Sequence, residues 1–219
     1  MQPPIDVTTL ERARLDDAVD VICDAFHDYP AMRFFLAATG SRYERHLRLL
    51  VGFFTEARFL RGDPVLGIEL GGELAAVAYV VKPDTLAPPA LEEHRERLWA
   101  ELGAAARARY EAFGRATASF PWPAEPHHDL SLIGVRRRLA GRGLARPLMD
   151  AVHQMSASDP CSSGVGLTTE LPKNLALYEH FGYRRIGHAQ LPGLAALETW
   201  GLFRQDPITD AVSARASST

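Results

Sequence analysis

Residues 130–145 decide the fold and read Leu-Ser-Leu-Ile-Gly-Val-Arg-Arg-Arg-Leu-Ala-Gly-Arg-Gly-Leu-Ala. The mostly apolar residues 130–135 predict a strand, and a turn rich in glycine and arginine leads into a helix over about 143–156. Backbone N–H groups at a helix start lack internal partners, and the helix dipole is positive there. Because glycines let an anion approach such amides closely, the turn predicts a phosphate-binding loop.

The same turn does not fit the common nucleotide-binding loops. No Lys-Ser or Lys-Thr follows the glycines, as a P-loop requires, and the third glycine of a dinucleotide fingerprint is missing. The alternative interpretation is an ordinary glycine-containing turn with solvated arginines, and the turn by itself leaves both interpretations open.

A second motif at residues 165–183 favours the phosphate loop. It reads Val-Gly-Leu-Thr-Thr-Glu-Leu-Pro-Lys-Asn-Leu-Ala-Leu-Tyr-Glu-His-Phe-Gly-Tyr and predicts a strand over 165–169 and a short helix over 173–181. Asn174 and Tyr178 are four residues apart, so we expect them to share one face of that helix.

The two motifs together resemble the GNAT superfamily of acyl-CoA-dependent N-acetyltransferases. In that family the phosphate loop reads Gln or Arg, two residues, Gly, one residue, and then Gly or Ala. Gly143 and Ala145 match this pattern, and Ala140 replaces its polar first residue. A second register through Arg138, Gly141 and Gly143 fits the spacing but misplaces the apolar pair that follows, so we favour the first.

The rest of the chain agrees with this fold class. Hairpins combined with one strand–helix–strand unit predict an α+β domain of three layers, α/β/α, around a mixed sheet. The resemblance implies that this sheet is mostly antiparallel and flanked by helices. We expect one domain over residues 1–205 and a flexible tail over 206–219. The other expected elements are helices at 15–26 and 41–60, one broken helix or two helices over 90–118, strands at 65–70, 74–81, 183–189 and 197–204, and an apolar loop at 29–36.

A wider likeness points to one branch of the superfamily, the puromycin N-acetyltransferase-like proteins. Residues 25–30, Ala-Phe-His-Asp-Tyr-Pro, resemble the N-terminal segment of that branch, and Thr199-Trp200 resembles its last strand.

The resemblance implies an enzyme that moves an acetyl group from acetyl-CoA to a primary amine of a small molecule, by direct attack in a ternary complex. Tyr178 matches the family Tyr that protonates the CoA thiolate, and Asn174 matches the Asn that touches the pantetheine arm. The implied cofactor-binding residues are Ile133, Gly134, Val135, Gly141, Arg142, Gly143, Leu144, Ala145, Arg146, Thr168, Asn174 and Tyr178.

The base that receives the amine proton stays open at this point. His128 and Asp129 begin the strand that leads to the site, and a histidine with a pKa near 6.5 could relay a proton at neutral pH. Glu170, after the other central strand, is a further candidate. The alternative interpretation is that each of these three residues lies at a strand end without a catalytic role. Since adjacent strand residues point to opposite faces, His127 and His128 do not readily share an ion, and we predict no metal.

Aromatic residues predict where the acceptor binds. We expect Tyr29, Phe34 and Phe35 from the apolar loop and Trp122 from the Pro-rich segment to line the acceptor site. Core or lid packing is the alternative interpretation. An aromatic-lined site suits a small amine with a flat or apolar body.

Composition narrows the partners. Hydrophobic residues make up 47% and charged residues 23%, which indicates a folded globular chain, and the net charge is −3. No general basic field is present for nucleic acid, and no apolar run approaches the ~18 residues of a membrane span. We therefore expect no nucleic-acid or membrane partner, a cytoplasmic location, and a homodimer as the candidate assembly. The rival hypothesis is a non-catalytic acyl-CoA sensor of the same fold, motivated by Ala140, by Arg137 where the family has Pro, and by the undefined base.

Overall fold

A seven-stranded sheet in the order β1-β2-β3-β4-β5-β7-β6 forms the centre of the molecule. The computed structural model describes residues 5–37, 39–193 and 196–207. Of the tail predicted over 206–219, residues 208–219 therefore lie outside the described residues. All neighbouring strands are antiparallel except β4 and β5, which confirms the predicted mixed, mostly antiparallel sheet. The strands are β1 (Thr8–Thr9), β2 (Val65–Leu70), β3 (Glu73–Val81), β4 (His128–Val135), β5 (Gly164–Thr169), β6 (Arg184–Leu191) and β7 (Leu197–Gln205).

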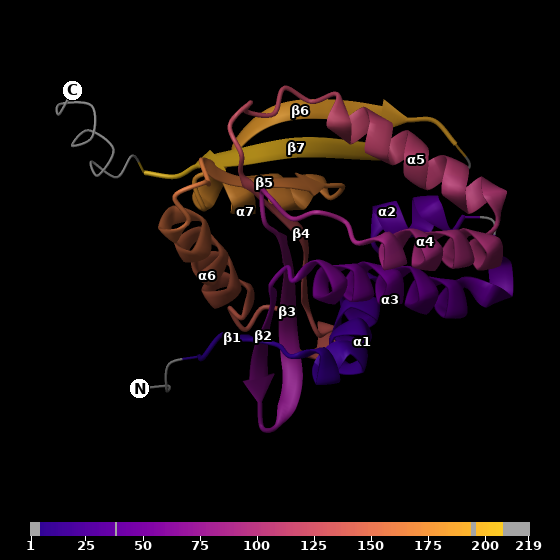
Figure 1. The fold of residues 1–219 in the computed structure, drawn as a ribbon, viewed down its shortest axis with the longest axis horizontal. Coiled ribbons are helices and arrows are strands. Elements are labelled where there is room, and N and C mark those ends of the chain that lie inside the picture. The colour runs from indigo at the N-terminus through magenta and orange to yellow at the C-terminus, as the bar shows by residue number, and fades with distance from the viewer. Residues whose placement is uncertain (1–4, 38, 194–195, 208–219) are drawn as a thin grey trace.

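Helices cover both faces of this sheet, as the three-layer prediction requires. Figure 1 shows α1 to α5 on one side and α6 on the other. Side chains alternate between the two faces of the sheet along β3, so this strand contributes to two hydrophobic cores. Val77 and Tyr79 pack under α1 and α3, whereas Ala76 and Ala78 face α6. The helices are α1 (Leu15–Phe26), α2 (Pro30–Phe35), α3 (Tyr43–Arg61), α4 (Pro89–Leu102), α5 (Ala104–Ala118), α6 (Ala145–Ser158) and α7 (Leu175–His180).

Two sequence expectations need correction, for residues 29–36 and for the start of α6, and one open alternative, for residues 90–118, is decided. The predicted apolar loop contains the helix α2, with Pro30 at its first position, where a missing N–H costs nothing. Residues 90–118 form two helices, because Gly103 at φ +86° and ψ 160° breaks the run. The helix α6 begins at Ala145 rather than 143, since Gly143 has φ +79°, and Pro147 then lies in the first turn, where its missing N–H has no helical partner.

The helical hairpin of α4 and α5 is an insertion between two neighbouring strands. β3 and β4 pair directly, yet residues 82–127 lie between them and fold back over α2, α3 and β7. At its end the Phe120 ring fills a hollow over the paired glycines Gly187 and Gly201, where an added Cβ would lie 2.3 and 2.5 Å from the ring. Arg109 of α5 donates two hydrogen bonds to the Phe35 carbonyl at the end of α2. The insertion is therefore fixed against the rest of the domain.

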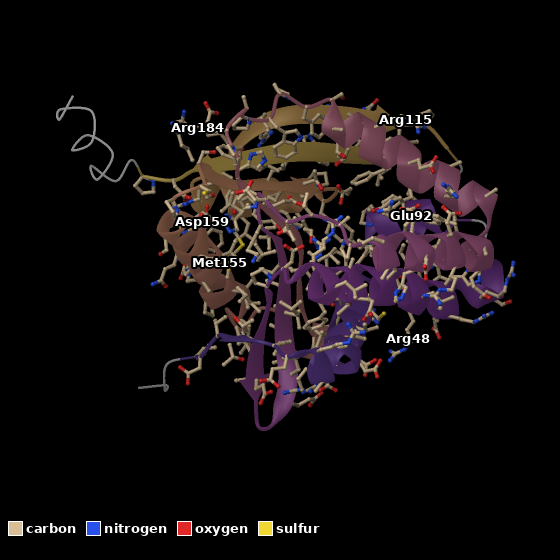
Figure 2. All side chains as sticks on the ribbon, in the orientation of Figure 1. Arg48, Glu92, Arg115, Met155, Asp159 and Arg184 are labelled. Atoms are coloured by element: carbon tan, nitrogen blue, oxygen red, sulfur yellow. The ribbon has the colours of Figure 1, made fainter. Side chains whose placement is uncertain are left out.

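Many charged side chains lie at the periphery. Figure 2 shows Arg48, Arg115 and Arg184 at the edge of the molecule, where Arg48 pairs with Asp20 of α1. Among the described residues, no helix combines the length and the apolar character that crossing a membrane requires.

Candidate active site

The central feature of the site is a gap in the sheet between β4 and β5. These parallel strands pair only at His128 with Val165 and at Asp129 with Gly166. Within the described residues, β4 beyond Asp129 keeps β3 as its only strand partner, and β5 keeps β7. One backbone edge of β4 therefore stays free to hydrogen-bond an extended ligand in the manner of an added strand.

A bulge in β4 lies at the start of this free edge. Tyr79 pairs with Leu132 and Val80 with Leu130, so Ser131 is an extra residue on β4. Such bulges bend a strand and redirect its side chains. The bulge separates Asp129, in the paired part, from Ile133 in the open part.

The predicted strand residues differ in their surroundings. Ile133 lines the cavity described below, whereas Gly134 is buried under α1, where an added Cβ would lie 2.9 Å from Ile22 and Ala25. Val135 ends the strand and pairs with Ala76 of β3. The glycine at 134 thus allows α1 to pack closely on β4.

A cavity of about 590 Å³ opens beside the gap. This volume suits a small ligand. Its aromatic wall comes from helices on one face of the sheet, from the residue before α2 and from the segment before β4, and includes Phe26, Tyr29, Phe35, Phe54, Tyr110, Phe113 and Trp122. Its polar wall includes Arg58, Asp129, Thr168, Glu170, Asn174 and Tyr178.

Asn174 and Tyr178 both line this cavity, in agreement with the shared face expected from their spacing. The Asn174 side-chain amide donates to Thr169 Oγ1 at 3.4 Å. Tyr178 is buried, with its ring edge-on to Tyr183 at 5.8 Å between centroids. Burial raises the pKa of Tyr178 to about 12, with a smaller contribution from Glu170, so its hydroxyl keeps its proton at neutral pH.

Glu170 is a buried carboxyl group at the end of β5. Its Oε1 accepts a hydrogen bond from the Thr199 hydroxyl at 2.7 Å, and its backbone N–H donates to the Tyr29 hydroxyl at 3.1 Å. Burial outweighs its hydrogen bonds and raises the pKa of Glu170 to about 7. A carboxyl group with that pKa can exchange a proton near neutral pH.

Asp129 is a second acid in the same cavity. Burial raises the pKa of Asp129 to about 6, partly offset by the positive charge of Arg58. Two acidic groups with raised pKa values therefore line one aromatic cavity, which is a typical arrangement at functional sites.

His128 needs a correction, because it does not line the cavity. Its Nδ1 lies 3.0 Å from Ser162 Oγ, its Nε2 lies 3.7 Å from the Asp159 carboxylate, and burial lowers its pKa. Side chains alternate along a strand, so Asp129 faces the cavity while His128 faces the loop after α6. Phe34 is likewise buried outside the cavity lining, whereas the other three predicted acceptor residues, Tyr29, Phe35 and Trp122, line it.

The predicted phosphate loop has an open backbone. Gly141 and Gly143 have φ values of +78° and +79°, and both are exposed. Among the described residues, nothing accepts a hydrogen bond from the amides of Gly143, Leu144 or Ala145 at the start of α6. Unpaired amides at a helix start form an anion site, and α6 beginning at Ala145 agrees with the favoured register.

The arginines near this loop divide into two groups. Arg136 donates to the Leu74 carbonyl, and Arg138 pairs with Glu73. Arg137 pairs with Asp24 in α1 and with Asp28, two residues after the end of α1. Two others have no carboxylate partner in the part of the chain that the structure describes: the Arg142 side chain is exposed, and the Arg146 guanidinium lies 5.0 Å from the Phe181 ring centroid. Of the five arginines near the loop, only Arg142 and Arg146 lack a carboxylate partner within the described residues, so we take these two as available to an anion, although Arg146 Nη2 also lies 3.2 Å from His180 Nε2.

Comparison with known proteins identifies the family. The family model described as the acetyltransferase (GNAT) family matches residues 11–183. The chain belongs to the GNAT acetyltransferase family. GNAT proteins are acyltransferases that use an acyl-CoA co-substrate and an acceptor, and the free edge of β4, the unpaired loop amides and the two available arginines fit such a ligand. No group of three or more metal-ligating side chains comes together within the described residues.

Solved structures agree with the GNAT fold. A protein from Corynebacterium glutamicum described as histone acetyltransferase HPA2 and related acetyltransferase is 18% identical, with a TM-score of 0.69 over 94% of this chain and 98% of that one. Arylalkylamine N-acetyltransferase 2 from Aedes aegypti is 13% identical, with a TM-score of 0.63 over 94% and 100%. The ribosomal-protein-S18-alanine N-acetyltransferase from Escherichia coli is 13% identical, with a TM-score of 0.51 over 93% and 95%. These identities support the fold alone, and no curated protein matches the sequence.

Several cavity residues were not predicted from the sequence. Phe54 and Arg58 lie on α3, and Tyr110 and Phe113 lie on α5, where aromatic residues at helical spacing indicate core packing as readily as ligand contact. The packing of α3 against the sheet and the folding of the α4–α5 insertion together turn these helix faces toward the gap.

Proposed function

We propose that this GNAT protein transfers an acetyl group from acetyl-CoA to a primary amine of a small molecule by direct attack in a ternary complex. The observation that carries the proposal is one aromatic cavity holding both a carboxyl group with a pKa near 7, Glu170, and a protonated buried hydroxyl, Tyr178, beside the free edge of β4.

Acetyl-CoA would occupy the gap and the loop. The backbone at Ile133 to Val135 would bond the pantetheine arm, while the amides of 143–145 and the side chains of Arg142 and Arg146 would hold the phosphates. Thr168 and Asn174 line the cavity on the opposite side of the gap. When bound, acetyl-CoA supplies a thioester carbonyl as the electrophile.

Three proton transfers accompany the reaction. Glu170 would accept a proton from the acceptor ammonium, because only the neutral amine has a lone pair for the attack. A C–N bond to the carbonyl carbon forms, the C–S bond breaks, and the Tyr178 hydroxyl would give its proton to the departing sulfur. The attacking nitrogen would then lose its second proton, which restores the Tyr178 hydroxyl, and Glu170 would release its proton to solvent. Asp129, ionised at neutral pH, would attract the ammonium group into the cavity.

The acceptor class follows from the aromatic wall, which suits a small amine with a flat or apolar body. The similar Aedes aegypti structure carries arylalkylamine in its name, which is consistent with such an acceptor. Within the family, residues 25–30 support the puromycin N-acetyltransferase-like branch as a finer proposal, although none of the three structures named above bears that name.

The decisive test is acetyl-CoA-dependent thiol release with a panel of primary amines and an amine-free control. We expect release with aromatic or apolar small amines, at rates well above the control. Binding of acetyl-CoA without release for any amine would instead favour the non-catalytic acyl-CoA sensor.

Two further proposals concern the protein in its cell. We retain the expected cytoplasmic location as a proposal. We also retain a homodimer as the assembly, to be measured by light scattering at several concentrations. A mass that stays at one 24.1 kDa chain would contradict it.

The phosphate loop gives a binding prediction. Gly143→Glu places a carboxylate beside the phosphates, so the Kd for acetyl-CoA should rise about tenfold or more, measured by calorimetry. Gly40→Glu is the matched control, because Gly40 is also exposed at a positive φ of +52° but lies between α2 and α3. An unchanged Kd for Gly143→Glu would show that the loop does not hold the phosphates.

A further inference from the structure

Arg58 of α3 is a buried cation in the cavity wall that the reaction described above does not use. Its side chain is only 13% exposed and lies one turn after Phe54. Its Nη1 donates a long hydrogen bond of 3.4 Å to Ser131 Oγ, and its Nε has no hydrogen-bond partner within the described residues. Arginine has five N–H donors, and buried donors are normally satisfied. Nε faces the Asp63 carboxylate, so the donors of Arg58 left without a partner within the described residues and open to a ligand are the remaining N–H groups of Nη1 and Nη2.

The charge of Arg58, in contrast, is already balanced. The Asp63 carboxylate, whose side chain is fully buried, lies 3.7 Å from Arg58 Nε and accepts hydrogen bonds from the Lys82 amide and the Thr85 hydroxyl. Arg61 and Asp129 are the other charged neighbours of Arg58. Two arginines and two aspartates leave no surplus positive charge, so a further buried carboxylate would lose hydration without a counter-charge.

Arg58 also lies close to the reacting end of the cavity. Its hydrogen-bond partner Ser131 is the bulge residue of β4, two residues from Asp129 and two residues from Ile133. A group on the acceptor that contacts Arg58 must therefore lie near the amine rather than at the far end of the aromatic wall.

We propose that Arg58 determines acceptor specificity by donating hydrogen bonds to an uncharged oxygen, a carbonyl or a hydroxyl, that the acceptor carries close to its amine. The inference rests on the proposed function and narrows its acceptor class to amines with an apolar or aromatic body and a neutral oxygen. Amines with a carboxylate at that position are disfavoured, because the charges around Arg58 already sum to zero.

Four acceptors that share the 2-phenylethylamine core test this proposal. L-phenylalaninamide offers a carbonyl, L-phenylalaninol a hydroxyl, 2-phenylethylamine no oxygen and L-phenylalanine a carboxylate. We expect kcat/KM for the amide or the alcohol to exceed that for 2-phenylethylamine at least about tenfold, the size of a hydrogen bond to a charged group, and L-phenylalanine to be the poorest acceptor.

Variants decide whether Arg58 causes the preference, since the four amines also differ in basicity. Arg58→Met alone leaves Asp63 buried without a counter-charge, so the double variant Arg58→Met/Asp63→Asn is the main test. In it, the kcat/KM ratio of the oxygen-bearing acceptors to 2-phenylethylamine should fall about tenfold. Arg45→Met, at an exposed arginine of the same helix, should keep the wild-type ratio.

Each outcome is decisive. A ratio that the double variant leaves unchanged overturns the role of Arg58, and a wild-type preference for L-phenylalanine overturns the neutral-oxygen class. Silence with all four acceptors, while another amine of the panel is acetylated, also overturns the inference but leaves the proposed function standing. If no amine of the panel causes thiol release although acetyl-CoA binds, the proposed function itself is wrong.

Discussion

Replacing Tyr178 with Phe is expected to lower kcat at least about 100-fold while the Kd for acetyl-CoA stays within about threefold of the parent value. The substitution keeps the buried ring that packs on Tyr183 and removes only the hydroxyl that we propose as the proton donor. General acid catalysis contributes about 100-fold to 10,000-fold, so the loss should appear in turnover rather than in binding.

Steady-state thiol release and calorimetric binding of acetyl-CoA separate these two quantities. Tyr183→Phe is the matched control, because Tyr183 is also buried but its hydroxyl pairs with His153 Nε2 at 3.0 Å and is not among the cavity-lining groups. The control should retain kcat within a few-fold. Parental turnover in Tyr178→Phe would remove Tyr178 from the mechanism.

Replacing Glu170 with Gln is expected to lower kcat/KM about 100-fold at pH 8 and to change the pH profile. The proposed base works only when it is deprotonated, and its pKa is raised from 4.5 to about 7. Activity of the parent protein should therefore be full above pH 7 and fall about tenfold per pH unit below it. The variant should lose this step, since an amide does not titrate.

Two companion variants make the assignment to Glu170 specific. The Thr199 hydroxyl donates to Glu170 Oε1, and this hydrogen bond lowers the pKa of Glu170. Thr199→Val removes the hydrogen bond and should raise that pKa, so the acid limb of the pH profile should move to higher pH. Asp129→Asn should leave the limb near pH 7. An acid limb near pH 6 that disappears in Asp129→Asn and persists in Glu170→Gln would identify Asp129 as the base.

The sequence allowed most elements to be predicted because their signals are local. Hydrophobic periodicity located α1, α3 and the hairpin of β2 and β3, and paired glycines at 71 and 72, both at positive φ, marked the turn between these strands. The short helix α2 was not predicted, since six residues are too few to establish a period. The two-residue strand β1 exists only through its pairing with β2, and no local pattern could indicate it.

The candidate site was predictable in its motif residues and not in its walls. Asn174 and Tyr178 are fixed four residues apart at one helix start, so a local motif places both in the cavity. Arg58 and Phe54 come from α3, and Tyr110 and Phe113 come from α5, which no motif connects with the phosphate loop. The distinction between His128 and Asp129 also needed the sheet, because only its packing shows which strand face meets α6.

By itself, then, the sequence determined the strand–loop–helix that offers free amides to an anion, the helix that presents Asn174 and Tyr178, and the α+β class. These features depend on backbone geometry within a few residues. The tertiary structure decided the opening between β4 and β5, the raised pKa of Glu170 and the balanced charge around Arg58. Those properties arise from burial and from contacts between segments distant in the chain, where desolvation and neighbouring charges act through space.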